Sequence, residues 1–332
     1  MSGKSISLRA HAKVNLSLYV TGRRDDGYHD IVSFMQGVSL YDEVTVALTD
    51  DGQVPETPAA GGFTYQSAPL RMGGYQVTLA SDAEEMPYDM RNLALRGAAA
   101  VLGPAAEAAA GADGAGADLP QIRITVRKRL PVAAGIAGGS GNAAASMLAV
   151  DHLLGYPYSL RELMARGAGV GADVPFSLLM NAYYNREELA DLPGIAEASP
   201  AAVMCGIGDV VEPAEPLEYE VLMMNPGTGI STALAYRAID ERPEPDRGPY
   251  DLFYNAFEEY TYRTDSEAWR LREAMEKHLH ADHTLLSGSG PTTVAYYKCK
   301  TAALQDFETA QTAGWMDSNW KIWHAHSGGE EV

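Results

Sequence analysis

The chain is poor in cysteine and in positive charge. Its 332 residues include only two cysteines, Cys205 and Cys299. Their spacing fits no zinc-binding pattern, so we expect free thiols rather than a metal site or a disulfide. Lysine and arginine number 25 against 44 aspartates and glutamates, which gives a formal net charge of −19. Nucleic acid is therefore excluded as a general partner, because binding a phosphate backbone needs an excess of basic residues.

Long hydrophobic runs are absent as well. No uninterrupted apolar stretch reaches the length of a membrane span. The first residues, MSGKSISLRAHAKV, lack the apolar core of a secretory signal. We therefore expect a cytoplasmic protein with no membrane contact. Hydrophobic residues make up 46% of the chain, which is enough for a substantial core in one large or two ordinary domains.

The hydrophobic pattern predicts a mixed α+β protein in two lobes joined near residue 215. Apolar residues that alternate along the chain, or form short apolar runs, predict strands over residues 5–21, 32–48, 121–126, 219–224 and 293–297. Helical patterns cover residues 91–102, 142–154, 252–275 and 302–312. A capping-box spacing opens another helix at Ser159. Residues 50–75 and 103–119 are rich in small and polar residues and are expected to be connections.

The most informative segment is a run of small residues, 130–146, that leads into a predicted helix. Its glycines free the backbone, and Ser140 or Asn142 can cap the helix. Unpaired N–H groups at a helix start hold phosphate. Basic residues gather just before it, at Arg123, Arg127, Lys128 and Arg129. The segment predicts a nucleotide or phosphate site, with a ligand-free contact between helix and strand as the alternative.

Three phosphate-loop patterns compete for this segment. A Walker loop needs a lysine after its glycines, and none follows here. The dinucleotide pattern matches residues 139–144, but the strand before it is basic and amphipathic and is not joined directly to the loop. The third pattern is the Pro-x-x-x-Gly-Leu-Gly-Ser-Ser loop of the GHMP small-molecule kinases, which residues 131–144 resemble closely.

Five further segments follow the order of that superfamily. They are HAKVNL at 11–16, TGRRDDGYH at 21–29, GADVPF at 171–176, NPG…ST at 225–232 and SGSGP at 287–291. The chain therefore resembles the GHMP kinase superfamily from about residue 8 to 297. The Asp-Gly-Tyr-His segment makes it most similar to the branch of the 4-diphosphocytidyl-2-C-methyl-D-erythritol kinases, which serve the non-mevalonate route to isoprenoids.

The resemblance implies a fold and a reaction. The fold is an N-terminal ATP-binding lobe like ribosomal protein S5 domain 2, over residues 1–215, and a ferredoxin-like C-terminal lobe, over residues 216–332. The reaction is ATP-dependent phosphorylation of the substrate's 2-hydroxyl. ATP and Mg²⁺ are then the cofactors, the partner is the small-molecule substrate, and the protein is a monomer or homodimer.

Two residues are expected to carry the reaction. Asp173 is the general base that takes the hydroxyl proton as the oxygen attacks. Lys13 is expected beside it, where an amine lowers the pKa of the carboxylate and stabilises the charge that develops on oxygen. Taken alone, Asp173 could be a helix cap ahead of Pro175, and Lys13 could be a solvated strand lysine. The two motifs together favour the catalytic interpretation.

Four residues are expected to bind the acceptor substrate. Asn15 shares the strand face of Lys13 and can contact the substrate from the same side. His29 could read the edge of cytosine with its ring nitrogens. Tyr28 and Tyr236 could stack on the two faces of that base. Solvation for Asn15 and simple packing for the tyrosines are the alternatives.

The remaining expectations concern ATP. Its site is expected to comprise Asn92, Lys128, Pro131, Ala133, Ala134, Gly135, Ile136, Ala137, Gly138, Gly139, Ser140 and Gly141. Asn92 could equally cap a helix, and Lys128 could belong to a solvated basic cluster. Ser140 is the one candidate Mg²⁺ ligand.

The chain departs from the family pattern in two places. Ala137 stands where the family has glycine, and Gly141 stands where it has a serine, so we expect reduced but real activity. An insertion at Asn181–Pro200 could act as a lid, change substrate choice or be a surface excursion. Two alternative functions stay open: another GHMP kinase, acting on homoserine, mevalonate or a sugar, and a catalytically silent ligand-binding homologue.

Overall fold

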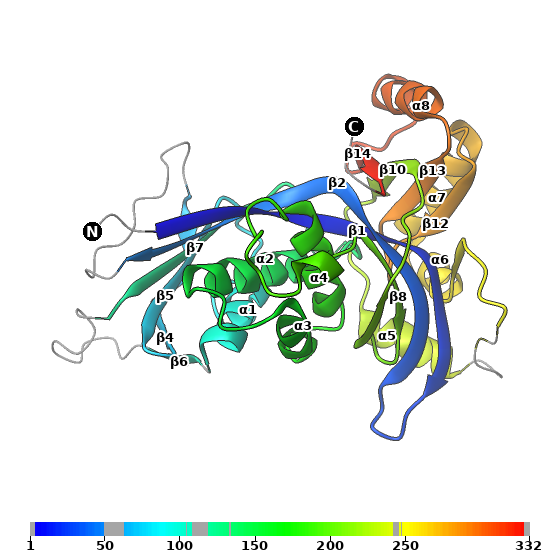
Figure 1. Ribbon diagram of the computed structural model, residues 1–332. Helices are drawn as coiled ribbons and strands as arrows, with labels where there is room; N and C mark the ends of the chain where they lie inside the picture. Colours follow the sequence, from blue (N-terminus) through cyan, green and yellow to red (C-terminus); the bar gives the residue numbers. More distant parts are fainter. Residues whose placement is uncertain are drawn as a thin grey trace. The chain divides into compact units, whose positions relative to one another are not determined.

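The computed structural model describes residues 4–49, 63–103, 105–107, 119–132, 134–241, 246 and 248–328. They form a mixed helix and sheet structure with two compact units (Figure 1), which confirms the α+β class. Unit 1 is drawn from Met1–His11, Tyr41–Val132 and Gly138–Ala198. Unit 2 is drawn from Ala12–Leu40, Ala133–Ala137 and Ser199–Val332. The units are thus discontinuous in sequence, and the single domain boundary at residue 215 stays a prediction.

Two long strands contribute residues to both units. β1 (Lys4–Arg23) and β2 (His29–Thr49) contain 20 and 21 residues, and the alternating pattern predicted both. Between them, the amide of Gly27 donates to the carbonyl of Arg24 and closes a turn. From Ala10 to Val20 every residue of β1 is buried, on both faces of the strand. Polar side chains on this stretch are therefore held inside the protein, where they need partners.

The sheet of unit 1 is built on the second half of β2. β7 (Gln121–Arg127) pairs antiparallel with β2 and parallel with β5 (Tyr75–Ser81). β5 also pairs with two short strands, β3 (Tyr65–Gln66) and β4 (Leu70–Met72), and β4 pairs with β6 (Ala105–Glu107). The prediction of a connection over residues 50–75 missed β3 and β4, and residues 50–62 lie outside the described residues. Most of the expected connection 103–119 also lies outside them.

Among its described residues, unit 1 contains four α-helices. They are α1 (Leu93–Leu102), α2 (Gly138–Leu153), α3 (Leu160–Ala168) and α4 (Val174–Tyr184), and α2 packs against all three others. Its small residues permit close approach: a Cβ on Gly97 of α1 would lie 2.6 Å from the carbonyl oxygen of Ala143. Ser159 forms the predicted capping box of α3. The expected start of α2 at residue 142 was wrong, because the helix begins at Gly138 and neither Ser140 nor Asn142 precedes it as its N-cap.

A buried carboxyl near the end of α2 makes stability depend on pH. Asp151 is fully buried, and burial raises its pKa to about 7. Its Oδ1 accepts from the amide of Tyr158, while Oδ2 has no hydrogen-bond partner among the described residues. The folded state therefore holds this proton more tightly than the unfolded state does. Stability falls as pH rises from about 4 to about 7, and the loss persists above that range.

We expect Asp151→Asn to raise the free energy of unfolding at pH 8 by about 2 kcal/mol, a figure reduced for screening and relaxation. The amide keeps the acceptor for Tyr158 and removes the ionisation. At pH 4 the two proteins should be nearly equal, as urea unfolding at both values would measure. The exposed Asp191→Asn is the matched control. An equal gain at both pH values would contradict this origin.

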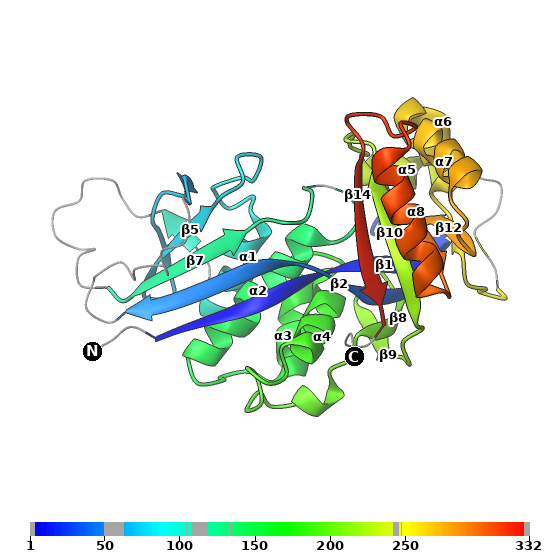
Figure 2. The same ribbon diagram turned by 90° about the horizontal axis from the view of Figure 1, so that it is seen from above.

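Unit 2 contains the ferredoxin-like arrangement that the resemblance implies. Its strands are β10 (Tyr219–Asn225), β12 (His283–Leu286), β13 (Thr293–Tyr297) and β14 (Lys321–Ser327). They lie antiparallel in the order β12-β13-β10-β14, and helices connect β10 to β12 and β13 to β14. α7 (Ser266–His278) and α8 (Lys300–Thr312) pack on this sheet, as Figure 2 shows for α8 beside β10 and β14.

The other elements of unit 2 surround its part of β1 and β2. β8 (Ala201–Cys205) pairs with β2 and with β9 (Val210–Pro213). β11 (Tyr254–Asn255) lies parallel to β1, between α5 (Thr232–Asp240) and α6 (Glu258–Thr264) in the chain. The expectation of mostly helical structure over 252–275 holds for α6 and most of α7. Both cysteines are free, as expected.

The segment Asn181–Pro200 is an ordered part of unit 1. Its first residues complete α4, and the side-chain oxygen of Asn181 accepts from the amide of His11 at 3.0 Å. Leu189 and Leu192 are buried, and the carbonyl of Pro193 accepts from the amide of Leu160 at the start of α3. A short 3₁₀ turn, η1 (Ile195–Glu197), precedes β8. These contacts anchor the segment to unit 1 at several points, and its role stays a prediction.

Candidate active site

Lys13 lies inside unit 2, on the buried stretch of β1. It is 2% exposed, so it is not the solvated strand lysine of the alternative interpretation. Its ammonium nitrogen donates to Oδ1 of Asn15 at 2.7 Å, and its amide donates to the carbonyl of Ile136 at 3.1 Å. The strand pattern correctly placed Lys13 and Asn15 on one face. A buried amine held by an amide oxygen keeps a defined position.

Asn15 is occupied by protein groups. It is fully buried, and its Oδ1 accepts from the amide of Gly288 at 3.0 Å in addition to Lys13. Its Nδ2 donates to Oγ of Ser33 at 2.8 Å, and its carbonyl accepts from the hydroxyl of Tyr296 at 3.0 Å. These contacts favour positioning of Lys13, whereas the predicted contact between Asn15 and substrate stays a prediction.

Two glycine loops of unit 2 meet backbone to backbone next to Lys13. Gly135 has φ +78°, and a Cβ there would lie 2.4 Å from the carbonyl oxygen of Ser287. Gly288 has φ +58°, and a Cβ there would lie 3.0 Å from the carbonyl oxygen of Gly135 and 3.6 Å from the ammonium of Lys13. The hydroxyl of Ser287 donates to the carbonyl of Gly135 at 3.1 Å. Both positions thus require glycine, for conformation and for space.

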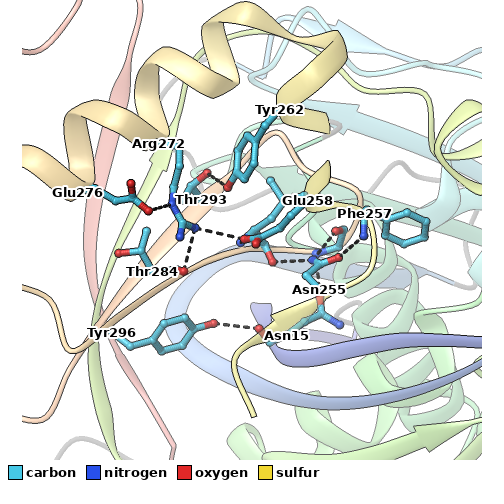
Figure 3. Close-up of polar contacts among 12 residues, drawn as sticks. Asn15, Asn255, Phe257, Glu258, Tyr262, Arg272, Glu276, Thr284, Thr293 and Tyr296 are labelled. Atoms are coloured by element: carbon cyan, nitrogen blue, oxygen red, sulfur yellow. Dashed lines mark hydrogen bonds and ion pairs between the residues drawn. The ribbon is translucent and has the colours of Figure 1, made fainter. Parts of the chain in front are cut away.

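Asn255 at the end of β11 holds the second of these loops (Figure 3). Its Nδ2 donates to the carbonyls of Leu286 and Gly288 at 2.7 and 2.8 Å, and its Oδ1 accepts from the amide of Phe257. No sequence pattern indicates this role, beyond a polar residue in an apolar surrounding. Through Gly288, this contact leads to Asn15 and then to Lys13.

A partly buried ion pair supports the same loop from α6 and α7. Glu258 accepts from the amide of Leu286 at 2.9 Å and from Arg272 at 3.2 Å, and Arg272 also donates to the carbonyl of Thr284 (Figure 3). Burial raises the pKa of Glu258. Burial likewise raises the pKa of Tyr262, whose ring packs over Arg272, to about 12. The pair fixes β12, from which the loop leaves.

The phosphate-loop residues are divided between the two units along the chain. Residues 134–137 belong to unit 2, whereas Pro131 and residues 138–141 belong to unit 1. Ala134 and Ile136 are buried, Gly135 and Ala137 are half-buried, and Ala133 lies outside the described residues. Pro131 is half-buried at the start of the loop. In the first turn of α2, Gly138 and Gly141 are buried, whereas Gly139 is exposed and Ser140 is half-buried. An open helix start with a bare glycine is suited to an anion.

Lys128 stands beside the start of α2 but already has a partner. A Cβ on Gly138 would lie 3.5 Å from its ammonium nitrogen, which forms an ion pair with Asp42. Asp42, fully buried in β2, also accepts from the amides of Arg129 and Leu130 at 2.7 and 2.9 Å. Lys128 is therefore not part of a solvated basic cluster. The sequence reasoning missed Asp42, although an acid in the apolar run of β2 was a signal.

The two departures from the family loop have different structural settings. Ala137 has φ +58°, a left-handed conformation that costs a side-chain residue roughly 1 kcal/mol or more. Gly141 lies against β1, where a Cβ would be 2.9 Å from the carbonyl oxygen of His11. The alanine is thus strained where glycine would fit, and the glycine is required where serine would collide.

We therefore expect opposite results when each position is returned to the family residue. Ala137→Gly should raise the free energy of unfolding by about 1 kcal/mol and lower the KM for ATP. Gly141→Ser should lower the free energy of unfolding by about 1–3 kcal/mol, although serine is the better helix former. Urea unfolding and ATP titration of both variants would measure this. A stabilised Gly141→Ser would contradict the close approach to β1.

Asp173 and Asn92 both occupy helix N-cap positions in unit 1. Asn92 caps α1 with its side-chain oxygen, donates to the carbonyl of Pro87 and is 7% exposed, which confirms the capping interpretation. Its expected proximity to adenine stays a prediction. Asp173 precedes α4, but its side chain makes no capping hydrogen bond. Its proximity to Lys13, which belongs to unit 2, stays a prediction.

The residues expected to read the base belong to unit 2. His29 stacks on Tyr236 with ring centroids 4.7 Å apart, and its Nε2 lies 2.7 Å from Oδ1 of Asp240. Tyr236 also packs edge-on against Phe257. Part of its ring surface is thus used by the protein, so its stacking on a base stays a prediction. Tyr28 is 61% exposed and has a ring open to a ligand.

The described residues contain no group of three or more His, Cys, Asp or Glu side chains that could hold a metal ion. None of the helices described is long and apolar enough to cross a membrane.

Comparisons with known proteins agree with this fold and these motifs. Residues 92–181, which include α1, the phosphate loop, α2 and Asp173, match the family model described as GHMP kinases N terminal domain. The mevalonate kinase of L. major, solved with R-mevalonate, shares the fold, with a TM-score of 0.55 at 13% identity over 100% of this chain and 98% of that one.

More specific relatives share both sequence and structure. The 4-diphosphocytidyl-2-C-methyl-D-erythritol kinase of Geobacter sulfurreducens is 30% identical over 94% of this chain and 97% of its own. That of Desulfotalea psychrophila is 30% identical over 88% and 86%. A crystal structure of 4-(cytidine 5'-diphospho)-2C-methyl-D-erythritol kinase has a TM-score of 0.66 at 28% identity, over 98% of this chain and 100% of that one. This chain belongs to the 4-diphosphocytidyl-2-C-methyl-D-erythritol kinase family.

Proposed function

We propose that this chain transfers the γ-phosphate of ATP to the 2-hydroxyl of 4-diphosphocytidyl-2-C-methyl-D-erythritol. The observation that carries the proposal is likeness to relatives of that name along nearly the whole chain, together with the motifs at Lys13, His29 and Asp173. Each of these three residues stands in a structural setting that suits a role in the reaction.

Asp173 is the general base of this proposal. Its carboxylate is half-buried at the start of α4 and is not used to cap the helix. A carboxylate at this place can act as a proton acceptor, and in the proposed reaction it accepts the hydroxyl proton as the phosphoryl group is transferred. Lys13, a buried cation held by Asn15, stabilises the charge on the attacking oxygen.

The start of α2 supports binding of the triphosphate. Gly138, Gly139 and Ser140 present a helix N-terminus, and glycines at 135 and 138 keep side chains away from it. Mg²⁺ bound with ATP would neutralise charge on the phosphate oxygens, with the Ser140 hydroxyl as the one protein ligand proposed.

The test is a substrate panel with purified protein and Mg-ATP. It contains the cytidylyl compound, base-free methylerythritol, homoserine, mevalonate and a sugar, with phosphorus NMR to locate the new phosphate. We expect turnover of the cytidylyl compound at its 2-position. His29→Ala should weaken turnover of that compound and leave any base-free alcohol unaffected. Turnover of homoserine or mevalonate instead would favour another GHMP kinase.

The strained backbone at Ala137 favours a second candidate function, that of a catalytically silent homologue that binds ligands without turnover. In that case ATP or the cytidylyl compound would bind, as calorimetry would measure, without turnover of any alcohol in the panel. Turnover restored by Ala137→Gly would identify the loop as the cause.

A further inference from the structure

One helix holds the imidazole of His29 by both its face and its edge. Tyr236 and Asp240 stand four residues apart on α5, so they lie on the same side of the helix. Tyr236 lies under the ring, at 4.7 Å and an interplanar angle of 21°. Asp240 meets the ring edge, with 2.7 Å between its Oδ1 and Nε2 of His29. The imidazole is 8% exposed, so little of it is open to water.

The position of Asp240 is not explained by the helix to which it belongs. Asp240 is the last residue of α5, where the negative end of the helix dipole disfavours a carboxylate. Its partners come from the strands instead: Oδ2 lies 3.2 Å from a guanidinium nitrogen of Arg23, on β1, and Oδ1 meets His29, on β2. Each carboxylate oxygen thus has its own partner, and both partners are nitrogen groups that can donate to a carboxylate.

An ionised carboxylate only accepts hydrogen bonds, so Nε2 of His29 must carry a hydrogen. In the neutral ring the other nitrogen, Nδ1, is then a lone-pair acceptor. Nδ1 has no hydrogen-bond partner among the described residues. The contact with Asp240 therefore makes Nδ1 a hydrogen-bond acceptor. This nitrogen can bind an N–H donor of a ligand but not a carbonyl oxygen.

We propose that Asp240 determines base specificity by fixing the tautomer of His29. This rests on the proposed cytidylyl substrate. Cytosine carries an exocyclic amino group, which can donate to Nδ1. Uracil carries a carbonyl oxygen at the same place, and two acceptors facing each other would leave both unpaired. Asp240 is thus a positioning residue, which acts on the substrate through His29.

The first test is NMR of the ¹⁵N-labelled full chain without ligand. The ring nitrogens of His29, assigned with His29→Gln among eight histidines, should show a protonated Nε2 and an unprotonated Nδ1 at pH 8. Asp240→Ala should give a mixture of tautomers. The matched control is Asp30→Asn, which removes a negative charge next to His29 in the chain, on an aspartate whose ion pair is with Arg24 rather than with the imidazole. A protonated Nδ1 in the neutral ring of the unmodified protein would overturn the proposal.

The second test compares the cytidylyl substrate with its uridylyl counterpart. Asp240→Ala should reduce the ratio of the two kcat/KM values by roughly 10-fold, mainly by raising the KM for the cytidylyl compound. Asp30→Asn should keep the ratio. An unchanged ratio in an active Asp240→Ala enzyme overturns the specificity role alone. Failure of the unmodified protein to phosphorylate the cytidylyl compound overturns the proposed function as well.

Discussion

Asp173→Asn is expected to lower kcat by about 10²–10⁴-fold while the protein stays folded. Asparagine and aspartate are equally good at helix N-caps, so the substitution keeps any local preference of the chain at the start of α4. The carboxylate makes no capping hydrogen bond in any case. What is removed is the capacity to accept a proton. Steady-state kinetics on the cytidylyl substrate, with the thermal midpoint measured alongside, would separate the two effects.

The chain offers a matched control for this substitution. Asp265 is the N-cap of α7, where its Oδ1 accepts from the amides of Glu267 and Ala268. Asp265→Asn makes the same chemical change at a cap that is used as a cap, and it should leave kcat unchanged. If Asp173→Asn retained most of its kcat, Asp173 would be a structural residue and the proposed mechanism would lose its base.

Lys13→Met is expected to lower kcat/KM by about 10²–10³-fold. Methionine fits a buried, largely apolar strand position, but it cannot provide a positive charge or donate to Asn15. Removing the amine leaves Oδ1 of Asn15 with its second donor, the amide of Gly288, so the surrounding loop keeps a contact. The exposed Lys298→Met is the control for loss of a positive charge elsewhere.

The double variant Lys13→Met with Asp173→Asn tests whether the two residues act on one step. If they do, the second substitution adds little, and the double variant should be about as slow as the slower single variant. Fully multiplicative losses would mean independent action, and they would contradict the expectation that the amine supports the carboxylate. This kinetic coupling reports on the pair directly, whichever unit each residue belongs to.

Local patterns predicted a large part of the structure. The alternation along β1 placed Lys13 and Asn15 on one face, and the capping box placed the start of α3. The glycine-rich segment was correctly expected to lead into a helix. Its exact start was missed, because Gly138 and Gly139 are poor helix formers that become helical through packing of α2 against its neighbours.

The partners of the site residues could not be predicted in the same way. Asp42 holds Lys128, Asn255 holds the loop at Gly288, and Asp240 holds His29. The last two side chains are separated by 211 residues. No periodicity, cap or turn signal relates residues at such distances, since those signals depend on neighbours along the chain.

The sequence by itself determined the family, many of the longer strands and helices, and the residue types that are expected to carry the chemistry. These follow from spacing along the chain, where backbone geometry sets which side chains share a face. Tertiary structure alone decided that Asn15 faces inward to Lys13 and Gly288, that only glycine fits at 141 against His11, and that Asp240 meets the ring edge of His29. Such contacts depend on how whole elements pack, because burial obliges each polar group to find its partner in space rather than in sequence.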